Sequence, residues 1–399
     1  MNICFIAIDY HQKSSGGGIA TYIDTLSQEL VKQGHSITIL AKARSKSTQF
    51  IEVKEGNPKI YFVALGNIHY YLHKVPFLGK RISSLIREFE WSFTIAIAVR
   101  KIIKKEQIDI IESQEVGNFL LMLFFRKIPI IIRTHGAPYN INKMSGQNTY
   151  IGDELDRAIE VWSMRRARCI TAPSRFKVEE IFKETGLNKS KVELIPNPIS
   201  PYIVNASEKR NVPPDQAQTI LYTGRIERRK GVVSLLRCVA PVILEDDNVQ
   251  FVLAGGYHRS LSDREVRAII QEEGIAEYIQ LKGHFPHEKL VDLYRTASIF
   301  VIPSQYETFS ISCIEAMAFG LPVVGTKGSA LPELIDDGVT GLLVSPNDPQ
   351  ALATAIIRLL KDKDLRQRLG QAGRKRILAE FTSEKITSQT IDLYKKVLS

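Results

Sequence analysis

Cysteine is scarce in this 399-residue sequence, and its spacing fits no metal motif. There is no C-x-x-C pair, because the four residues, Cys4, Cys169, Cys238 and Cys313, lie far apart in the chain. Spacing of this kind argues against a zinc or redox motif. Low cysteine usage is typical of proteins in a reducing cytosol, so we expect the protein to be cytoplasmic.

Long hydrophobic runs are also missing. The most apolar stretch, FLLMLFFRKIPIII at 119–132, is 14 residues long and carries Arg126 and Lys127 in its middle. It is too short and too charged to span a membrane. An earlier apolar run, ICFIAI at 3–8, has no basic region before it and predicts a first strand rather than a signal peptide. We therefore expect a soluble protein, with peripheral binding to the inner face of the membrane left open.

Several well-known functional motifs are absent. The sequence has no H-E-x-x-H, G-x-S-x-G or EF-hand loop, and no helix-turn-helix, zinc-finger or RNP pattern. Its one D-x-D, Asp362-Lys-Asp364, lies far from any predicted strand end and is typical of a solvated turn. We therefore expect no nucleic-acid partner, no bound metal and no cofactor.

Positive charge is concentrated in the first half of the chain. The formal net charge is +10, and residues 1–200 contain 28 Lys and Arg against 19 Asp and Glu, whereas residues 201–399 contain 25 against 24. This asymmetry suggests an anionic partner for the first half, such as a phosphate, a lipid headgroup or nucleic acid. The alternative is a basic surface without a specific partner.

Apolar β-rich segments alternate with helical patterns along the whole chain, which predicts parallel sheets built from βαβ units. The predicted strands are 2–8, 36–41, 59–65, 108–112, 129–134, 169–172, 192–195, 218–223, 249–254, 279–282, 299–303, 322–325 and 341–344. The predicted helices are 19–33, 80–105, 148–167, 174–185, 232–243, 262–273, 287–297, 312–319 and 348–360.

A stretch rich in Pro, Asn and Ser at residues 196–218 separates two series of such units and is typical of a linker. Together with the length of the chain, it predicts two doubly wound α/β domains. Ligands of such sheets bind at the carboxyl ends of the strands, so we expect the two domains to face each other across a ligand-binding cleft.

The segment ILYTGRIERRKG ends a predicted strand at Thr223 and places Arg225 and Lys230 five positions apart before a helix. Two cations at the carboxyl end of a strand can neutralise the charge that develops on a leaving diphosphate. The alternative is an ordinary basic surface loop, in which Arg228 and Lys230 are solvated.

Glu307 follows the predicted strand 299–303 and its neighbour Ser304. Together with Phe309 and Ser310 it lies in a strand-end loop, where a carboxylate can accept hydrogen bonds from hydroxyl groups. Helix formation offers no explanation for a carboxylate at this position, so we interpret Glu307 as a ligand contact.

Glu315 has a structural explanation as well as a functional one. Ser312-x-x-Glu315 fits a capping box, with Ser312 as the N-cap of the following helix. In the functional reading, Glu307 and Glu315 are two acceptors for a nucleotide sugar with two sets of vicinal diols.

The first half offers two weaker candidates. Gly16, Gly17 and Gly18 directly precede a predicted helix, where glycine lets the backbone approach a phosphate closely; a flexible loop is the alternative. His135 closes the predicted strand 129–134 and is a candidate polar contact or proton carrier, although a lone histidine is often structural.

Taken together, these residues resemble glycosyltransferase family 4, a retaining family with the GT-B fold. The most specific part is the E-x7-E pattern of YETFSISCIEAMAFGLP, with GRIERRKG before it and LPELIDDGVTGLLV after it. The resemblance implies an N-terminal Rossmann-like acceptor domain at 1–199, completed by a returning C-terminal helix at 382–399, and a donor domain at 200–381. An apolar stripe suits that helix to its return: Ile386, Ile391, Leu393, Tyr394 and Val397.

The resemblance also implies roles for the candidate residues. Arg225 and Lys230 match the pair that holds the donor diphosphate, Glu307 the glutamate that meets the donor sugar, and Glu315 the one that binds the ribose. His135 resembles a first-domain histidine near the transferred sugar. Gly17 and Gly18 resemble the loop that approaches the diphosphate and the acceptor.

The implied activity is transfer of a hexosyl unit from a UDP- or GDP-sugar to an acceptor hydroxyl, with retention of the anomeric configuration and without a metal. Many relatives have Gly-Gly before x-P-E where this chain has Gly328-Ser329 before Ala330-Leu331-Pro332-Glu333, so the donor sugar stays open. The alternatives are a non-catalytic nucleotide-sugar or polyanion-binding protein and a sugar-nucleotide epimerase or hydrolase of the same fold.

The acceptor is expected on the basic first domain. The predicted helix 80–105 has an apolar face with Lys and Arg at both ends, and could lie on an anionic membrane. The acceptor would then be lipid-linked; otherwise it is a saccharide, as in polysaccharide biosynthesis. The alternative for this segment is an ordinary core helix with solvated ends.

Overall fold

The computed structural model shows two compact α/β units. It describes all residues except 8–9, 11–16, 44–50, 65–78, 137–150, 209–217 and 286, and the side chains at 51–52, 79–84, 151–152, 189 and 287–288. Among the described residues, the first unit runs to Pro198 and includes Ser383–Ser399, and the second unit is Ile199–Thr382.

The first unit is built on a sheet with the strand order β3-β4-β2-β1-β5-β6-β7-β8. All its pairs are parallel except β3 with β4, and β3 was not predicted from the sequence. The strands are β1 Asn2–Ala7, β2 Ser36–Lys42, β3 Ile51–Lys54, β4 Lys59–Val63, β5 Ile110–Ser113, β6 Ile130–Arg133, β7 Cys169–Ala172 and β8 Val192–Leu194.

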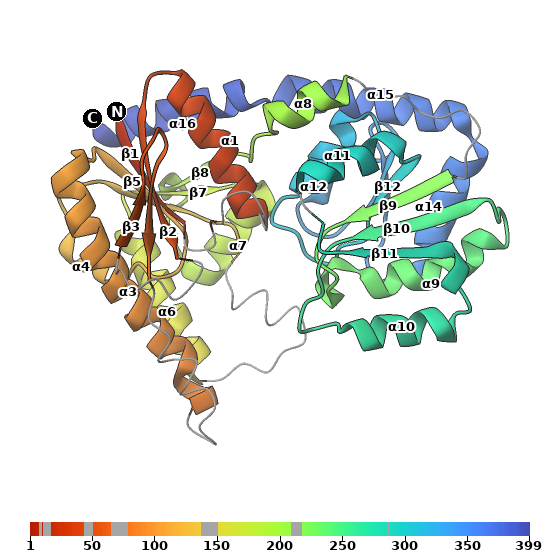
Figure 1. Cartoon of the computed structure of the whole chain (residues 1–399), viewed down its shortest axis with the longest axis horizontal. Helices are drawn as coiled ribbons and strands as arrows, with labels where there is room; N and C mark the ends of the chain where they lie inside the picture. Colours follow the sequence, from red (N-terminus) through yellow and green to blue (C-terminus); the bar gives the residue numbers. More distant parts are fainter. Residues whose placement is uncertain are drawn as a thin grey trace. The chain divides into compact units, whose positions relative to one another are not determined.

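Helices cover both faces of this sheet (Figure 1). One face packs against α1 (Gly18–Lys32) and α16 (Ser383–Leu398). The other packs against a second group: α3 Gly79–Glu106, α4 Phe119–Phe124, α6 Ile151–Arg166 and α7 Arg175–Thr185. Within the described ranges, no helix combines the length and the hydrophobicity needed to cross a bilayer.

The C-terminal helix α16 belongs to the first unit. Every residue of its predicted apolar stripe is buried. Its Tyr394 hydroxyl donates a hydrogen bond of 2.7 Å to buried Glu112 on β5, and the Tyr22 hydroxyl of α1 donates to the same carboxylate at 2.8 Å. The end of the chain is therefore fixed to the first sheet by both packing and a buried hydrogen bond.

The second unit has a parallel sheet with the strand order β11-β10-β9-β12-β13-β14. Its strands are β9 Gln218–Thr223, β10 Val249–Ala254, β11 Ile279–Gly283, β12 Ile299–Ile302, β13 Val323–Thr326 and β14 Leu342–Val344. Its helices are α8 Pro201–Ser207, α9 Val232–Ile243, α10 Asp263–Glu272, α11 His287–Thr296, α12 Ile311–Ala318, α13 Leu331–Leu334, α14 Pro349–Lys361 and α15 Lys363–Glu380.

This strand order defines where a ligand can bind. In chain order within the unit it reads 3-2-1-4-5-6, the order of Rossmann-like sheets, in which the winding direction reverses between the first and fourth strands. Those strands are β9 and β12, which pair directly. Ligands of such sheets bind where the winding reverses, at the carboxyl ends of the strands. The loops after β9 and β12 therefore form the expected binding edge.

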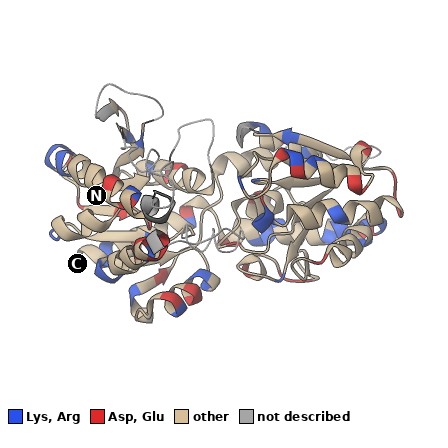
Figure 2. Cartoon of the chain, turned by 90° about the horizontal axis from the view of Figure 1, so that it is seen from below, with Lys and Arg blue, Asp and Glu red and all other residues tan. Residues whose placement is uncertain are grey.

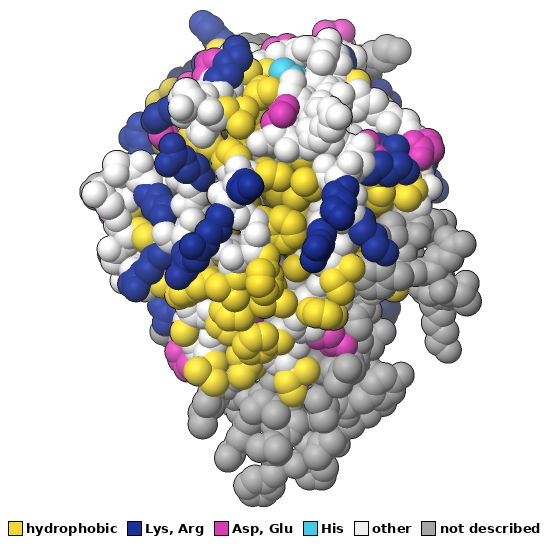
Figure 3. Space-filling view, turned by 90° about the vertical axis from the view of Figure 1, so that its left-hand side faces the viewer, with side chains coloured by type: hydrophobic (Ala, Val, Ile, Leu, Met, Phe, Trp, Pro, Cys, Tyr) yellow, Lys and Arg dark blue, Asp and Glu magenta, His cyan; other side chains and the backbone are white. Residues whose placement is uncertain are grey.

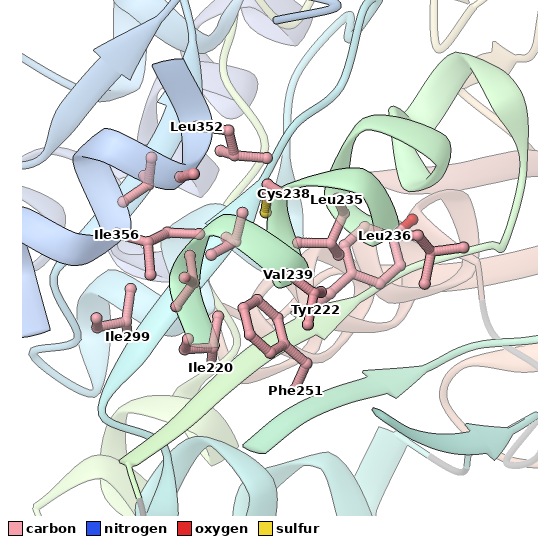
Figure 4. Close-up of a cluster of buried hydrophobic side chains, with 14 of the residues drawn as sticks. Ile220, Tyr222, Leu235, Leu236, Cys238, Val239, Phe251, Ile299, Leu352 and Ile356 are labelled. Atoms are coloured by element: carbon pink, nitrogen blue, oxygen red, sulfur yellow. The ribbon is translucent and has the colours of Figure 1, made fainter. Parts of the chain in front are cut away.

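The core of the second unit holds β9 in place beneath that edge. Figure 4 shows side chains of α9, such as Leu235 and Val239, packed against Ile220 and Tyr222 of β9, with Ile356 of the neighbouring α14 in the same cluster. Charged residues lie mainly on helices and loops, while the strands are largely uncharged (Figure 2). Burial of these apolar groups, at roughly 25 cal/mol per Å², makes the sheet a rigid base for its loops.

The predicted linker 196–218 is partly wrong, because its middle forms the helix α8. Pro201 occupies the first turn, where its fixed φ favours a helix, and Ser200 is the N-cap position. Ile203 is fully buried in the core of the second unit. The same Pro-rich composition that predicted a linker therefore starts a short packed helix. Residues 209–217 lie outside the described part.

Candidate active site

The loops after β9 and β12 are packed tightly against each other at Gly231. This residue has φ +70°, and a Cβ built on it would lie 1.9 Å from the carbonyl oxygen of Pro303, which follows β12. Only glycine allows this approach and this backbone conformation. The amide of Gln305 also donates to the Arg229 carbonyl at 2.8 Å. These contacts bring residues about 77 positions apart in sequence into one site.

Lys230 and Glu307, two of the predicted site residues, are in direct contact. The Lys230 ammonium donates to Oε1 of Glu307, and the Ser304 hydroxyl donates to the same oxygen at 3.1 Å. Glu307 is almost fully buried, while 19% of the Lys230 side chain is exposed. Burial lowers the pKa of Lys230, and the attraction of Glu307 opposes that shift. The pair thus presents a partly desolvated cation at the binding edge.

Arg225 lies at the start of the same loop but contacts a different carboxylate. Its Nη2 is 3.3 Å from Oε1 of Glu227, and 53% of its side chain is exposed. The Tyr222 hydroxyl donates to the backbone carbonyl of Arg225 at 2.7 Å and so fixes where the loop leaves β9. Arg225 and Lys230 are therefore both held by acidic partners and both reach solvent.

Glu315 is buried on α12 and bound to a tyrosine. The Tyr294 hydroxyl donates to Oε2 of Glu315 at 3.0 Å, and it also lies 2.8 Å from the hydroxyl of Thr223, the last residue of β9. Glu315 is 3% exposed. A chain of two hydrogen bonds thus links it to the strand end that precedes Arg225.

The predicted capping box at Ser312 and Glu315 is wrong. The N-cap of α12 is Ser310, whose hydroxyl accepts from the amide of Cys313 at 3.3 Å, so Glu315 lies two positions beyond the N3 position. Both serines fit the N-cap preference, and the helix begins two residues earlier than the spacing suggested. Helix capping therefore does not explain Glu315.

Two other predicted donor contacts have structural tasks. The Phe309 side chain is buried in the core, with its ring 5.9 Å from that of Phe381, so it could reach a donor only through its backbone. The Ser310 hydroxyl caps α12. Ser304, in contrast, lies beside Glu307 with its hydroxyl on the carboxylate.

Sequence reasoning missed three residues that organise this site: Glu227, Arg229 and Tyr294. Glu227 and Arg229 stand among five charged residues in RIERRK, where nothing in the composition shows which side chains point inward. The feature that could have identified the inward-facing side chain is the turn. Arg228–Lys230 form a 3-10 turn, in which successive side chains point about 120° apart. One of each three residues then faces the protein, and here it is Arg229, 5% exposed.

His135 follows β6 in the first unit. Its backbone amide and that of Gly136 donate to Oε1 of Glu115 at 2.6 and 2.9 Å, and its ring packs edge-on against Tyr22 at 5.3 Å. Burial, with Arg133 and Lys177, lowers the pKa of His135 well below its usual value. The imidazole is therefore neutral at neutral pH. It can donate or accept a hydrogen bond, but it carries no positive charge.

Gly17 is the N-cap of α1, and Gly18 is its first residue. No side chain caps this end of the helix, and a Cβ at Gly17 would meet nothing within 4 Å. Packing within the described residues therefore does not require glycine at position 17. Gly16 and residues 11–15 lie outside the described part.

The described residues include no group of three or more His, Cys, Asp or Glu close enough to hold a metal ion. All four cysteines are buried and unpaired with one another. Asp362 of the D-x-D sequence is the N-cap of α15 and accepts from the Leu365 amide at 2.8 Å. Its role is thus helix capping between α14 and α15.

Two family models match the chain. One, described as glycosyl transferases group 1, matches residues 204–376, and the other, described as glycosyltransferase family 4, matches residues 16–201. Among relatives, an MMP alpha-(1->4)-mannosyltransferase of Mycolicibacterium hassiacum is 24% identical over 98% of each chain. An uncharacterized glycosyltransferase of Methanocaldococcus jannaschii is 30% identical over 60% of this chain, and the match spans 62% of its own length.

Solved structures share the fold over the whole chain. Sucrose-phosphate synthase from Thermosynechococcus elongatus matches with a TM-score of 0.81 and 23% identity, covering 99% of this chain and 98% of the other. Anabaena HepE in complex with UDP-glucose matches with a TM-score of 0.71 and 16% identity, covering 99% and 100%. At these identities the likeness concerns the fold.

The two α/β units and these neighbours define the GT-B fold, and the matching family models define a glycosyltransferase. With the two models matching nearly its full length, the chain belongs to glycosyltransferase family 4.

The packing at Gly231 gives a first prediction. Gly231→Ala should lower the free energy of unfolding by more than about 3 kcal/mol, since the methyl group would overlap the Pro303 carbonyl in addition to the strain of a positive φ. Gly274→Ala is the matched control, because Gly274 has φ +67° but open space around its Cβ, and should cost only about 1–2 kcal/mol. Urea-induced unfolding measures both, and equal losses would contradict the tight packing.

Proposed function

We propose that the protein is a retaining glycosyltransferase that moves a hexosyl unit from a nucleoside-diphosphate sugar to an acceptor hydroxyl. The observation that carries the proposal is the contact of Lys230 with Glu307, close to the loop that carries Arg225, where the winding of the second sheet reverses. Cations there suit a diphosphate, and carboxylates suit the hydroxyl groups of a sugar and a ribose.

In this proposal the donor diphosphate binds Arg225 and Lys230, while Glu307 binds the transferred sugar and Glu315 the ribose. Ser304 orients Glu307, and the backbone near Phe309 and Ser310 lines the site. Catalysis comes from positioning and from neutralising the negative charge that develops on the leaving diphosphate. The two cations supply that positive charge, so no metal or other cofactor is required.

The donor is proposed to be a UDP- or GDP-sugar. Solved neighbours named as complexes with UDP, UDP-glucose and UDP-2-fluoro glucose support a nucleotide-sugar donor. The second unit, residues 200–381, is the donor side. The first, residues 1–199 with 382–399, is the acceptor side, where His135 and the α1 start at Gly17 and Gly18 contact the sugar or the acceptor.

We further propose that the acceptor is lipid-linked or a polysaccharide precursor, and that the protein works in the cytoplasm at the inner face of the membrane. Figure 3 shows hydrophobic side chains gathered on the end of the first unit that carries α3 and α4, with Lys and Arg along their border. The exposed large apolar side chains of α3, α4 and α6 are Phe89, Phe93, Phe124 and Leu155.

Charge complementarity supports an anionic bilayer as the partner of this surface. Phe93 is 59% exposed and Phe124 is 70% exposed, which is costly in water and favourable in the boundary between headgroups and acyl chains. Exposed cations of α3 and of the turn after α4 accompany them: Arg100, Lys101, Lys104, Lys105, Arg126 and Lys127. Each basic side chain near an anionic surface contributes about 1 kcal/mol of attraction.

Lys230→Ala tests the donor site. We expect turnover to fall by about 100-fold or more, because the variant loses a cation that faces the leaving diphosphate. Arg228→Ala is the control, since Arg228 belongs to the same turn but is 48% exposed and pairs with Glu265 on α10. Release of nucleoside diphosphate from UDP- and GDP-sugars measures both; normal turnover of the Lys230 variant would remove its diphosphate role.

Metal removal tests the charge-neutralising role of the cations. The wild-type enzyme should keep its turnover within about twofold after exhaustive treatment with EDTA, because Arg225 and Lys230 provide the compensating charge. Turnover is measured with and without added Mg²⁺ or Mn²⁺. A loss on chelation that either ion restores would show that a metal carries part of the mechanism.

Sedimentation with liposomes tests the membrane surface. The protein should pellet with phosphatidylglycerol vesicles at low salt and be released at high salt, because screening weakens the electrostatic attraction. Phe93→Ser combined with Phe124→Ser should reduce binding by about tenfold or more. Leu244→Ser removes an apolar side chain that is 87% exposed on the second unit and should change nothing. Wild-type protein that stays in the supernatant would exclude membrane docking.

A further inference from the structure

Glu227 is a fully buried carboxylate between two arginines. It lies in the loop after β9 and is 0% exposed. Its Oε1 accepts a hydrogen bond of 2.6 Å from Nη2 of Arg229, and Nη2 of Arg225 is 3.3 Å from the same oxygen. A buried charge is costly unless it is paired, so this carboxylate and its two arginines stabilise one another as a unit.

The second carboxylate oxygen of Glu227 takes no part in binding the two arginines. Oε2 has no hydrogen-bond partner among the described residues, and Nδ1 of His258 lies 3.4 Å from it. The same nitrogen lies 3.1 Å from the Ser260 hydroxyl and 3.3 Å from the Ser260 amide. A single oxygen therefore holds both guanidinium groups.

Through Arg229 this carboxylate also reaches the loop after β12. Arg229 Nη1 donates to the Tyr306 carbonyl at 2.9 Å, and Tyr306 directly precedes Glu307. The Arg229 carbonyl accepts from the Gln305 amide at 2.8 Å. The path from Glu227 to the residue beside Glu307 thus consists of two short hydrogen bonds in a buried setting.

Within this charged unit, Arg225 is the residue that faces the proposed donor. Its side chain is 53% exposed, and a free arginine at such a position would lose rotamer entropy when a phosphate fixes it. The contact with Glu227 restricts that motion before a ligand arrives. Preorganisation of this kind increases affinity because the ordering cost is met in the folded protein.

We infer that Glu227 is a positioning residue, which orients Arg225 toward the donor diphosphate and, through Arg229, aligns the loop that carries Glu307. The inference rests on the proposed function and deepens it, because it assigns the orientation of the diphosphate site to a residue that touches neither sugar nor phosphate. Glu227 is needed for its geometry, since its negative charge alone would repel a diphosphate.

The two possible effects of Glu227→Gln have opposite signs. Loss of the negative charge alone would make the site more cationic and would strengthen binding of a nucleoside diphosphate. Loss of positioning would weaken binding of a nucleoside diphosphate. We expect binding of UDP or GDP alone to weaken by about tenfold, as measured by calorimetry, because the amide has a weaker hold on Arg225.

A double-mutant cycle with Arg225→Ala separates positioning from a general structural effect. If Glu227 acts through Arg225, Glu227→Gln should change nucleotide affinity by less than about threefold once Arg225 is absent. Glu265→Gln is the matched control, because it removes the same charge from the exposed partner of Arg228 and should leave affinity within about twofold. An equal loss in both backgrounds, or tighter binding by the single variant, would overturn the inference.

Two further outcomes are informative. If Glu227→Gln does not fold, the same cycle in the Arg229→Met background avoids a buried guanidinium without a counter-charge, and the same coupling is expected. If the wild-type protein binds neither UDP nor GDP, the proposed donor site fails and this inference fails with it. Binding by the wild type together with an additive cycle overturns the inference alone.

Discussion

The contact between the loops after β9 and β12 is the constraint on which the site depends. At Gly231 the first loop passes so close to Pro303 that no side chain fits between them. This approach places the Lys230 ammonium on the Glu307 carboxylate. Neither charge could be buried there alone, since an unpaired buried ion costs several kcal/mol. The pair is therefore a consequence of the packing and also holds the two loops together.

Strand order explains why these loops meet. β9 and β12 are adjacent in the sheet although two βα units separate them in the chain. The sequence predicted nearly every strand, because runs such as IFVI between turn residues have few alternatives. It predicted Arg225, Lys230 and Glu307 because each follows a strand. Their mutual distances could not be predicted, because these depend on the order of strands and not on their existence.

Other features could not be predicted from the sequence, for physical reasons. Ser310 and Ser312 both suit an N-cap, and packing of α12 decides between them, which moved Glu315 from a capping position to a buried one bound to Tyr294. The start of α8 resembled a linker in the sequence, because proline favours both linkers and the first turns of helices. Glu227 could not be distinguished among neighbouring charges, because its burial results from the turn at Arg228–Lys230 and from the packing around it.

Each cation of this site has an acidic partner, and this affects how a donor binds and leaves. Arg225 and Arg229 share Glu227, and Lys230 has Glu307, so the cluster carries a net surplus of one positive charge. Unpaired cations would repel one another and would lose their fixed positions. Binding that is equally tight for substrate and transition state does not accelerate the chemical step, so the placement of the cations matters more than their number. The carboxylates thus fix the geometry of the cations, which is the property that transition-state stabilisation requires.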